Sequence, residues 1–165
     1  MIGLVRLHKL LLPATLGVLI TAACSDAATP TPSSSSSSGS LPSNVSFKDD
    51  VAPLLATNCA LAACHSSKES NLNFYITYDT AQIYEEIMKT SPTCASSKFV
   101  SPGKPEESMI MLKMDNEQNK LAADCASARR SEMPPGDPPG SGSDLMTKKD
   151  RDIVRSWIKA GAKNN

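Results

Sequence analysis

A close pair of cysteines followed at once by a histidine is the feature of this sequence that most restricts its fold. The stretch from Asn58 to Ser67 reads NCALAACHSS, with four residues between Cys59 and Cys64 and with His65 directly after them. Such a group either forms a disulfide beside an unrelated histidine or holds another chemical group through sulfur and nitrogen. These two possibilities place different covalent bonds at Cys59 and Cys64, and the fold must accommodate whichever bonds form.

The first 23 residues have the features of a secretory signal peptide. Arg6 and Lys9 form a short positive region, residues 10–20 are mostly apolar, and small residues then lead to Cys24. The segment is too short for a helix that stays in the membrane. It resembles a bacterial lipoprotein signal, in which the cysteine is acylated and begins the mature chain. We therefore expect a signal peptide at 1–23, lipidation at Cys24 and a location in the bacterial cell envelope, on the periplasmic or outer-membrane face.

A linker follows the expected lipid anchor. Residues 25–43 are rich in serine, proline and threonine and offer almost no apolar surface to bury, so nothing offsets the entropy cost of ordering them. A flexible coil of this length has a root-mean-square reach of about 25 Å. We expect a disordered tether over residues 24–44 that holds a single domain, residues 45–165, away from a membrane.

The charge balance argues against a nucleic-acid partner. Removing Arg6 and Lys9 from the 17 basic residues leaves 15 against 17 acidic ones, a net charge near −2 for the mature chain. Nucleic-acid binding calls for a basic surface. We expect partners of other kinds.

Cysteine counting leaves two arrangements open. Of the five cysteines, lipidation would use Cys24, and the other four would lie in an oxidising compartment where thiols seldom persist. In the first arrangement Cys59 and Cys64 bond covalently to a haem and Cys94 pairs with Cys125. In the second, all four form two disulfides in one of three pairings.

Histidine adds to this comparison. His8 leaves with the signal, so His65 is the one imidazole of the mature chain. In the haem-attachment signature C-x-x-C-H the histidine binds the iron, but here four residues separate the cysteines. At about 100° per residue these two positions do not share a helix face, so residues 60–63 must leave the helix. A Cys59–Cys64 disulfide needs the same disruption. A zinc site has the ligand types but lacks a second close ligand pair.

Apolar periodicity and capping residues predict an all-α domain with short helices and long loops. We expect four helices. The first has Asp50 as N-cap and ends near Asn58, and the second runs from Asp79 or Thr80 to about Lys89. The third spans residues 105–115, and the fourth runs from Thr147 to a C-cap at Gly161. Residues 115–144 are polar and irregular, and MPPGDPPGSGS excludes a helix. The expected buried residues are Val51, Leu54, Leu55, Ile83, Tyr84, Ile87, Met109, Ile110, Leu112, the stem of Lys113, Ile153, Val154, Trp157 and Ile158.

The order of several short motifs resembles a known family. These are Val51-x-Pro53, Cys64-His65, Val100-Ser-Pro-Gly-Lys-Pro-Glu-Glu-Ser108, Met133-Pro-Pro135 and a last helix with Ile153, Trp157-Ile158 and Gly161-Ala162. Together they resemble the c-type cytochrome domains of exported planctomycete and myxobacterial proteins, over residues 47–162. The resemblance implies a cytochrome c-like α-helical fold.

The resemblance also implies a ligand set. Cys59 and Cys64 match the thioether positions of haem c, His65 the proximal iron ligand and Met133 the distal one, and His/Met ligation raises the reduction potential. Met109, Met111 and Met114 compete for the distal role, but on a helix we expect them in the core. Cys94 with Cys125 becomes a structural disulfide.

The expected function is that of a lipid-anchored, exported monohaem cytochrome that carries single electrons between redox proteins, rather than an enzyme. One alternative is a haem-free, disulfide-stapled binding or scaffold lipoprotein on the same fold. The other is a haem enzyme such as a peroxidase, with an open distal position if Met133 does not bind the iron.

Overall fold

The computed structural model describes residues 40–61, 64–69, 73–130, 132–135 and 141–165. The expected signal peptide, Cys24 and the tether up to residue 39 lie outside the described residues. Within the described ranges, no helix has the length and apolar character needed to cross a membrane.

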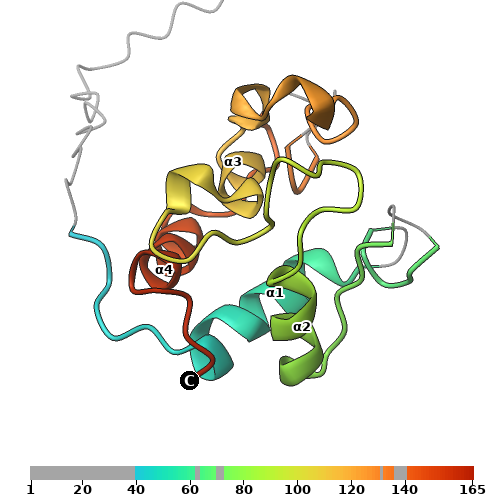
Figure 1. The fold of residues 1–165 in the computed structure, drawn as a ribbon. Coiled ribbons are helices and arrows are strands. Elements are labelled where there is room, and N and C mark those ends of the chain that lie inside the picture. Colours follow the sequence, from blue (N-terminus) through green and yellow to red (C-terminus); the bar gives the residue numbers. More distant parts are fainter. Residues whose placement is uncertain (1–39, 62–63, 70–72, 131, 136–140) are drawn as a thin grey trace, which may run out of the picture. The chain divides into compact units, whose positions relative to one another are not determined.

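The described part of the chain is helical, with no strand and one isolated antiparallel bridge between Thr90 and Lys98. This confirms the predicted all-α class. Figure 1 shows α1 packed with α2, and α3 packed beside α4. The elements are η1 (Phe47–Val51), α1 (Ala52–Cys59), α2 (Thr80–Ile87), η2 (Pro105–Glu107), α3 (Met109–Met114), η3 (Gln118–Lys120), η4 (Ala123–Cys125) and α4 (Lys148–Lys159).

The helix that leads into the first cysteine starts earlier than predicted. Ser46 is the N-cap, and its side chain accepts the amide of Asp49 at 3.2 Å, while Asp50 accepts the amide of Ser46 at 2.8 Å. The prediction of Asp50 as N-cap is wrong, because Ser46 caps the chain four residues earlier and leaves Asp50 in the first turn. The wide turn of η1 then precedes Pro53, whose nitrogen has no hydrogen to donate.

The single helix predicted over 105–115 is broken at Ser108. This residue has extended backbone, and its hydroxyl accepts the amide of Ser101 and donates to the carbonyl of Lys104, both at 2.9 Å. The first amides of α3 donate to the backbone at Lys98 and Phe99 instead of to the preceding turn. The buried residues of α3 are Met109, Met111, Leu112 and Met114, of which Met109 and Leu112 were predicted. Ile110 and Lys113, whose stem was predicted to be buried, are half-buried.

The C-terminal helix follows its predicted caps. Thr147 caps α4 through its side chain. At the other end the amide of Gly161 donates to Ile158 O and that of Ala162 to Trp157 O, both at 2.9 Å, which is a Schellman motif. Gly161 has φ +100°, a conformation that glycine adopts without steric cost.

Trp157 lies at the centre of the main core and is 1% exposed. Its ring packs against Phe47 of η1 with centroids 5.1 Å apart and against Tyr84 of α2 at 6.4 Å. Its indole N–H donates to Lys163 O at 2.8 Å, so burial leaves no polar atom of this side chain unpaired. The last residue, Asn165, also bonds to the start of η1, and Figure 1 shows these two segments side by side.

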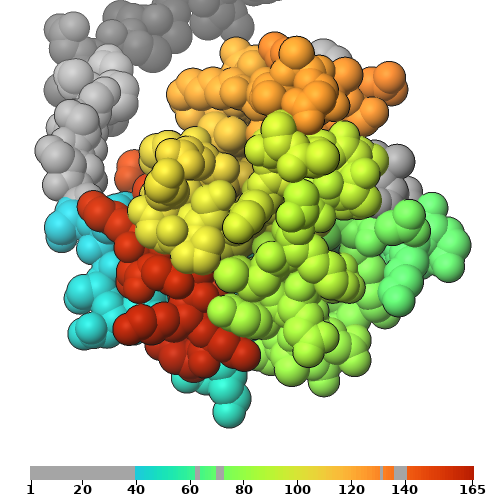
Figure 2. Space-filling view, viewed as in Figure 1, coloured from blue at the N-terminus to red at the C-terminus, as the bar shows by residue number. Residues whose placement is uncertain are grey.

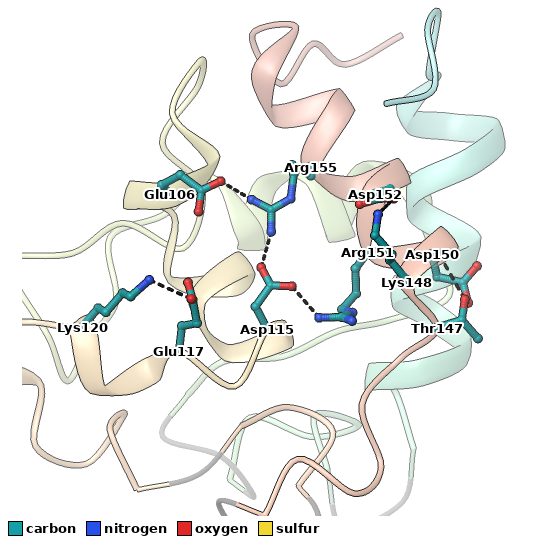
Figure 3. Close-up of polar contacts among 10 residues, drawn as sticks. All are labelled: Glu106, Asp115, Glu117, Lys120, Thr147, Lys148, Asp150, Arg151, Asp152 and Arg155. Carbon is teal, nitrogen blue, oxygen red and sulfur yellow. Dashed lines mark hydrogen bonds and ion pairs between the residues drawn. The ribbon is translucent and has the colours of Figure 1, made fainter. Parts of the chain in front are cut away.

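An ion-pair network joins α4 to the end of α3. Asp115, the C-cap of α3, pairs with Arg151 at 2.7 Å and with Arg155, which also pairs with Glu106 of η2 (Figure 3). The side chains of Asp115, Arg151 and Arg155 are only 13%, 21% and 19% exposed. The network therefore connects η2, α3 and α4 through ion pairs, and all of its side chains except that of Glu106 are mostly buried.

Replacing Asp115 by asparagine should lower the free energy of unfolding by about 1–3 kcal/mol, because Arg151 and Arg155 would keep partly buried charges without a carboxylate between them. Urea unfolding followed by circular dichroism measures this loss. Glu117→Gln is the matched control, since Glu117 pairs only with the exposed Lys120 and should change stability by less than about 1 kcal/mol. Equal losses in the two variants would contradict the assignment.

A second, smaller core cluster surrounds a disulfide. Cys94 and Cys125 are joined across 31 residues and are 1% and 0% exposed. Phe99, Met109, Leu112 and Leu121 pack around them. The bond ties η4 to the loop between α2 and α3, the yellow-green segment that crosses the face shown in Figure 2.

Replacing Cys94 and Cys125 together by serine should lower the free energy of unfolding by about 3–4 kcal/mol, the loop-closure value for a bridge of this span. Chemical unfolding with and without reductant measures the effect. Reductant should destabilise the natural chain by a similar amount and leave the double variant unchanged. A natural chain whose stability reductant leaves unchanged would contradict this assignment.

Candidate functional site

The described residues line a partly open cavity of about 260 Å³ between α1, α3 and neighbouring loops, including the loop that follows η4. It brings together the four residues expected from the sequence to hold a haem, namely Cys59, Cys64, His65 and Met133. The other described lining residues are Leu55, Asn58, Leu61, Phe74, Ile76, Ser91, Pro92, Thr93, Phe99, Met109, Ile110, Lys113, Met114, Ser127, Ala128, Pro134 and Pro135.

The wide spacing of the two cysteines is accommodated by a turn. Helix α1 ends at Cys59, the amide of Cys64 donates to Leu61 O at 2.9 Å, and the amide of His65 returns to Cys59 O at 3.0 Å. The chain thus leaves the helix after the first cysteine and comes back to it at the histidine. This local path lets both sulfurs and the imidazole line one cavity although Cys59 and Cys64 would not share a helix face.

His65 is oriented by a hydrogen bond to backbone. Its Nδ1 lies 3.2 Å from Phe74 O, and because a carbonyl only accepts, Nδ1 carries the proton. The neutral ring then has its lone pair on Nε2. Burial lowers the pKa of His65, the charge of Lys113 lowers it further, and the Phe74 bond opposes both. The Phe74 ring also packs edge-on against the imidazole, with centroids 4.8 Å apart. This is the tautomer and the support that a metal-binding histidine requires.

The electrostatics of the cavity follow from burial. Cys59 and Cys64 are thiols in the structure, and burial, with a smaller effect from Cys64, raises the pKa of Cys59 to about 12. Burial lowers the pKa of Lys113 to about 8, and the negative charge of Glu132 opposes this. Lys113 is the one charged side chain among the described lining residues, and its ammonium donates to Ala128 O at 2.6 Å.

A zinc site at this position has no support in the arrangement. Among the described residues, the one cluster of three metal-ligating side chains is Cys94, Asp124 and Cys125. Two of its sulfurs already form the disulfide. Cys59, Cys64 and His65 do not converge in this way, although they share the cavity.

Three methionines reach the cavity. Met109 and Met114 are 3% and 2% exposed on α3, as core residues are, while Met133 is half-buried in a loop and its amide donates to Lys113 O at 3.0 Å. Met111, the other competing methionine, is buried but does not line the cavity.

Sequence reasoning missed several residues of the site. Phe74 and Phe99 form an aromatic wall with ring centroids 4.2 Å apart, and Glu132 is completely buried beside Met133. All three lie in loops, where no helical period marks a buried side chain. For Glu132, the one sequence signal was that this charged residue directly precedes Met133, the expected distal ligand.

No family model, no curated protein and no solved structure matches this chain. The all-α class rests on the structure, and the likeness to cytochrome c domains rests on the sequence motifs.

The reduced, haem-free chain offers a test of this burial. Cys59 should react with iodoacetamide at pH 8 about 10³-fold more slowly in the folded protein than in urea, because raising its pKa from 9.0 to about 12 leaves about a thousandth of the thiolate. Mass spectrometry of the Cys59 peptide over time measures the rate. Similar rates in the two solvents would contradict the raised pKa of Cys59.

Proposed function

We propose that this protein is an exported, membrane-anchored monohaem c-type cytochrome that carries single electrons between redox proteins. The observation that supports this most is the shared cavity of Cys59, Cys64, His65 and Met133. These are the residue types that attach haem c and complete its iron coordination. The bound haem would supply an iron that changes between Fe(III) and Fe(II).

The donor set suits that group. The turn after Cys59 brings Cys64 and His65 to the same cavity as Cys59, and the Nδ1–H of His65 is held by Phe74 O, so its Nε2 lone pair is available to a metal. Met133 offers a soft thioether, which favours a higher reduction potential than a harder ligand would. Each of these groups belongs to this chain and needs no partner to complete it.

The walls around these ligands are mostly apolar. Leu55, Ile76, Phe74 and Phe99 contribute apolar surface, and Lys113 brings the one charge of the described lining. An apolar shell around a redox centre raises the potential and limits solvent access. A flexible tether, as expected from residues 24–44, would let the domain reach partners near a membrane.

A second candidate is a haem-free binding or scaffold lipoprotein. Two observations favour it: four residues separate the cysteines instead of two, and the cavity of about 260 Å³ is slightly smaller than the ~300–1,000 Å³ of most small-molecule sites. On this reading Cys59 and Cys64 remain protein thiols or a disulfide, and the cavity takes a small apolar ligand.

The first experiment is expression of the full chain together with a haem-attachment system. We expect a red protein with a Soret band, a mass increased by one haem, and loss of the native spectrum in His65→Ala, because the proximal nitrogen is gone. Colourless protein of unmodified mass from the same cells would overturn the proposal and favour the second candidate.

The distal ligand is tested by changing single methionines to leucine, which nearly conserves volume. Met133→Leu should lower the reduction potential, because the iron loses its thioether. Met114→Leu and Met111→Leu, one lining the cavity and one not, are the matched controls and should leave the potential nearly unchanged. A fall in potential in Met114→Leu alone would assign the distal role to α3.

A further inference from the structure

We infer that Glu132 is a positioning residue that holds Met133 at the cavity wall. This inference rests on the proposed function, because it assigns Glu132 to the support of the expected distal ligand. Glu132 directly precedes Met133 and is 0% exposed. Glutamate is almost never fully buried unless its carboxylate is compensated, so its position requires specific partners.

One such partner is a backbone amide ten residues further along the chain. The carboxylate oxygen Oε1 of Glu132 accepts the amide of Gly142 at 2.8 Å. On the other side, the amide of Met133 donates to Lys113 O at 3.0 Å, at the end of α3. The described stretch 132–135 is therefore held to α3 through its backbone and to Gly142 through the Glu132 side chain.

The Lys113 side chain interacts electrostatically with Glu132. Lys113 also lines the cavity, and its ammonium donates to Ala128 O at 2.6 Å. Residue Lys113 thus supplies both the carbonyl that holds Met133 and a positive charge near the carboxylate that precedes it. The backbone hydrogen bond and this attraction both connect residues 132–133 to α3.

Gly142 donates to Glu132 from a backbone conformation that favours glycine, because its φ is +71°. A Cβ at this position would lie 2.8 Å from Nδ2 of Asn116, the end of a side chain that can rotate away. The backbone conformation therefore makes glycine the suitable residue at the donor position of the Glu132–Gly142 hydrogen bond.

This support matters because a thioether is a neutral, soft ligand that competes with other ligands for a metal. A ligand side chain in a loop stays in place only if surrounding contacts hold it. Removing the Glu132 contact should free Met133 to leave the cavity wall. An added ligand would then reach the vacated position more readily.

The test uses the haem-loaded full chain and titration with imidazole, which competes with the methionine for the iron. Glu132→Ala should lower the apparent Kd for imidazole by about 10- to 100-fold, the range expected for losing a hydrogen bond to a charged group. It should also weaken the long-wavelength absorption band of the thioether–iron bond. Glu132→Gln should restore most of the natural behaviour, because its amide oxygen still accepts from Gly142.

A pair of glycine variants tests the same contact from its other end. Gly142→Ala should shift imidazole binding in the same direction as Glu132→Ala, because a side chain at φ +71° strains the backbone that holds the donor amide. Gly103→Ala is the matched control: Gly103 has φ +80°, so it carries similar backbone strain, but its amide donates to Ile158 O and not to Glu132. It should leave imidazole binding unchanged even if it lowers stability.

The outcomes separate this inference from the proposed function. Red protein in which Met133→Leu alters imidazole binding, while Glu132→Ala and Gly142→Ala bind it like the natural chain, overturns the positioning role alone. Equal effects of Gly142→Ala and Gly103→Ala also overturn it, since general strain would then explain both. If the natural chain carries no haem, the proposed function and this inference fall together. If Glu132→Ala does not fold, the comparison of imidazole binding between Gly142→Ala and Gly103→Ala tests the positioning role of Glu132.

Discussion

The burial of Trp157 between Phe47 and Tyr84 is the contact on which the arrangement of the described domain depends. These three rings come from α4, η1 and α2, elements that are far apart in sequence. Their packing buries large apolar surfaces, which is the main favourable term in folding. Because η1 runs directly into α1, fixing η1 against α4 also fixes the direction in which α1 points and the place where it ends at Cys59.

The candidate site lies at that end of α1 and is separate from the aromatic centre. Trp157 does not line the cavity, so its role is to position the helices. Helix α3 completes the cavity wall, and the Asp115 network and the disulfide cluster hold α3 in place. Two residues of the disulfide cluster, Met109 and Phe99, also line the cavity. Polar groups inside this apolar space, such as His65 and Lys113, have shifted pKa values because water is largely excluded from them.

Several local features could be predicted from the sequence because their signals are local. Thr147 and Gly161 mark the ends of α4, and Asp79 caps α2, since capping depends only on residues within one turn. The cap at Asp50 was wrong because Ser46 satisfied the same rule four residues earlier. The break at Ser108 was missed because it depends on bonds to the segment around Lys98, which lies outside any local window.

The sequence by itself determined the all-α class and the caps of α2 and α4, and it singled out the residues that we propose hold a haem, because helical period, capping and residue chemistry are all readable along the chain. Only the tertiary structure decided that the chain turns back so that His65 bonds to Cys59, and that Met133 reaches the same cavity. It also decided that Glu132 is buried beside Met133 and bonded to Gly142. These contacts join residues in loops, whose positions follow from the packing of the helices that they connect.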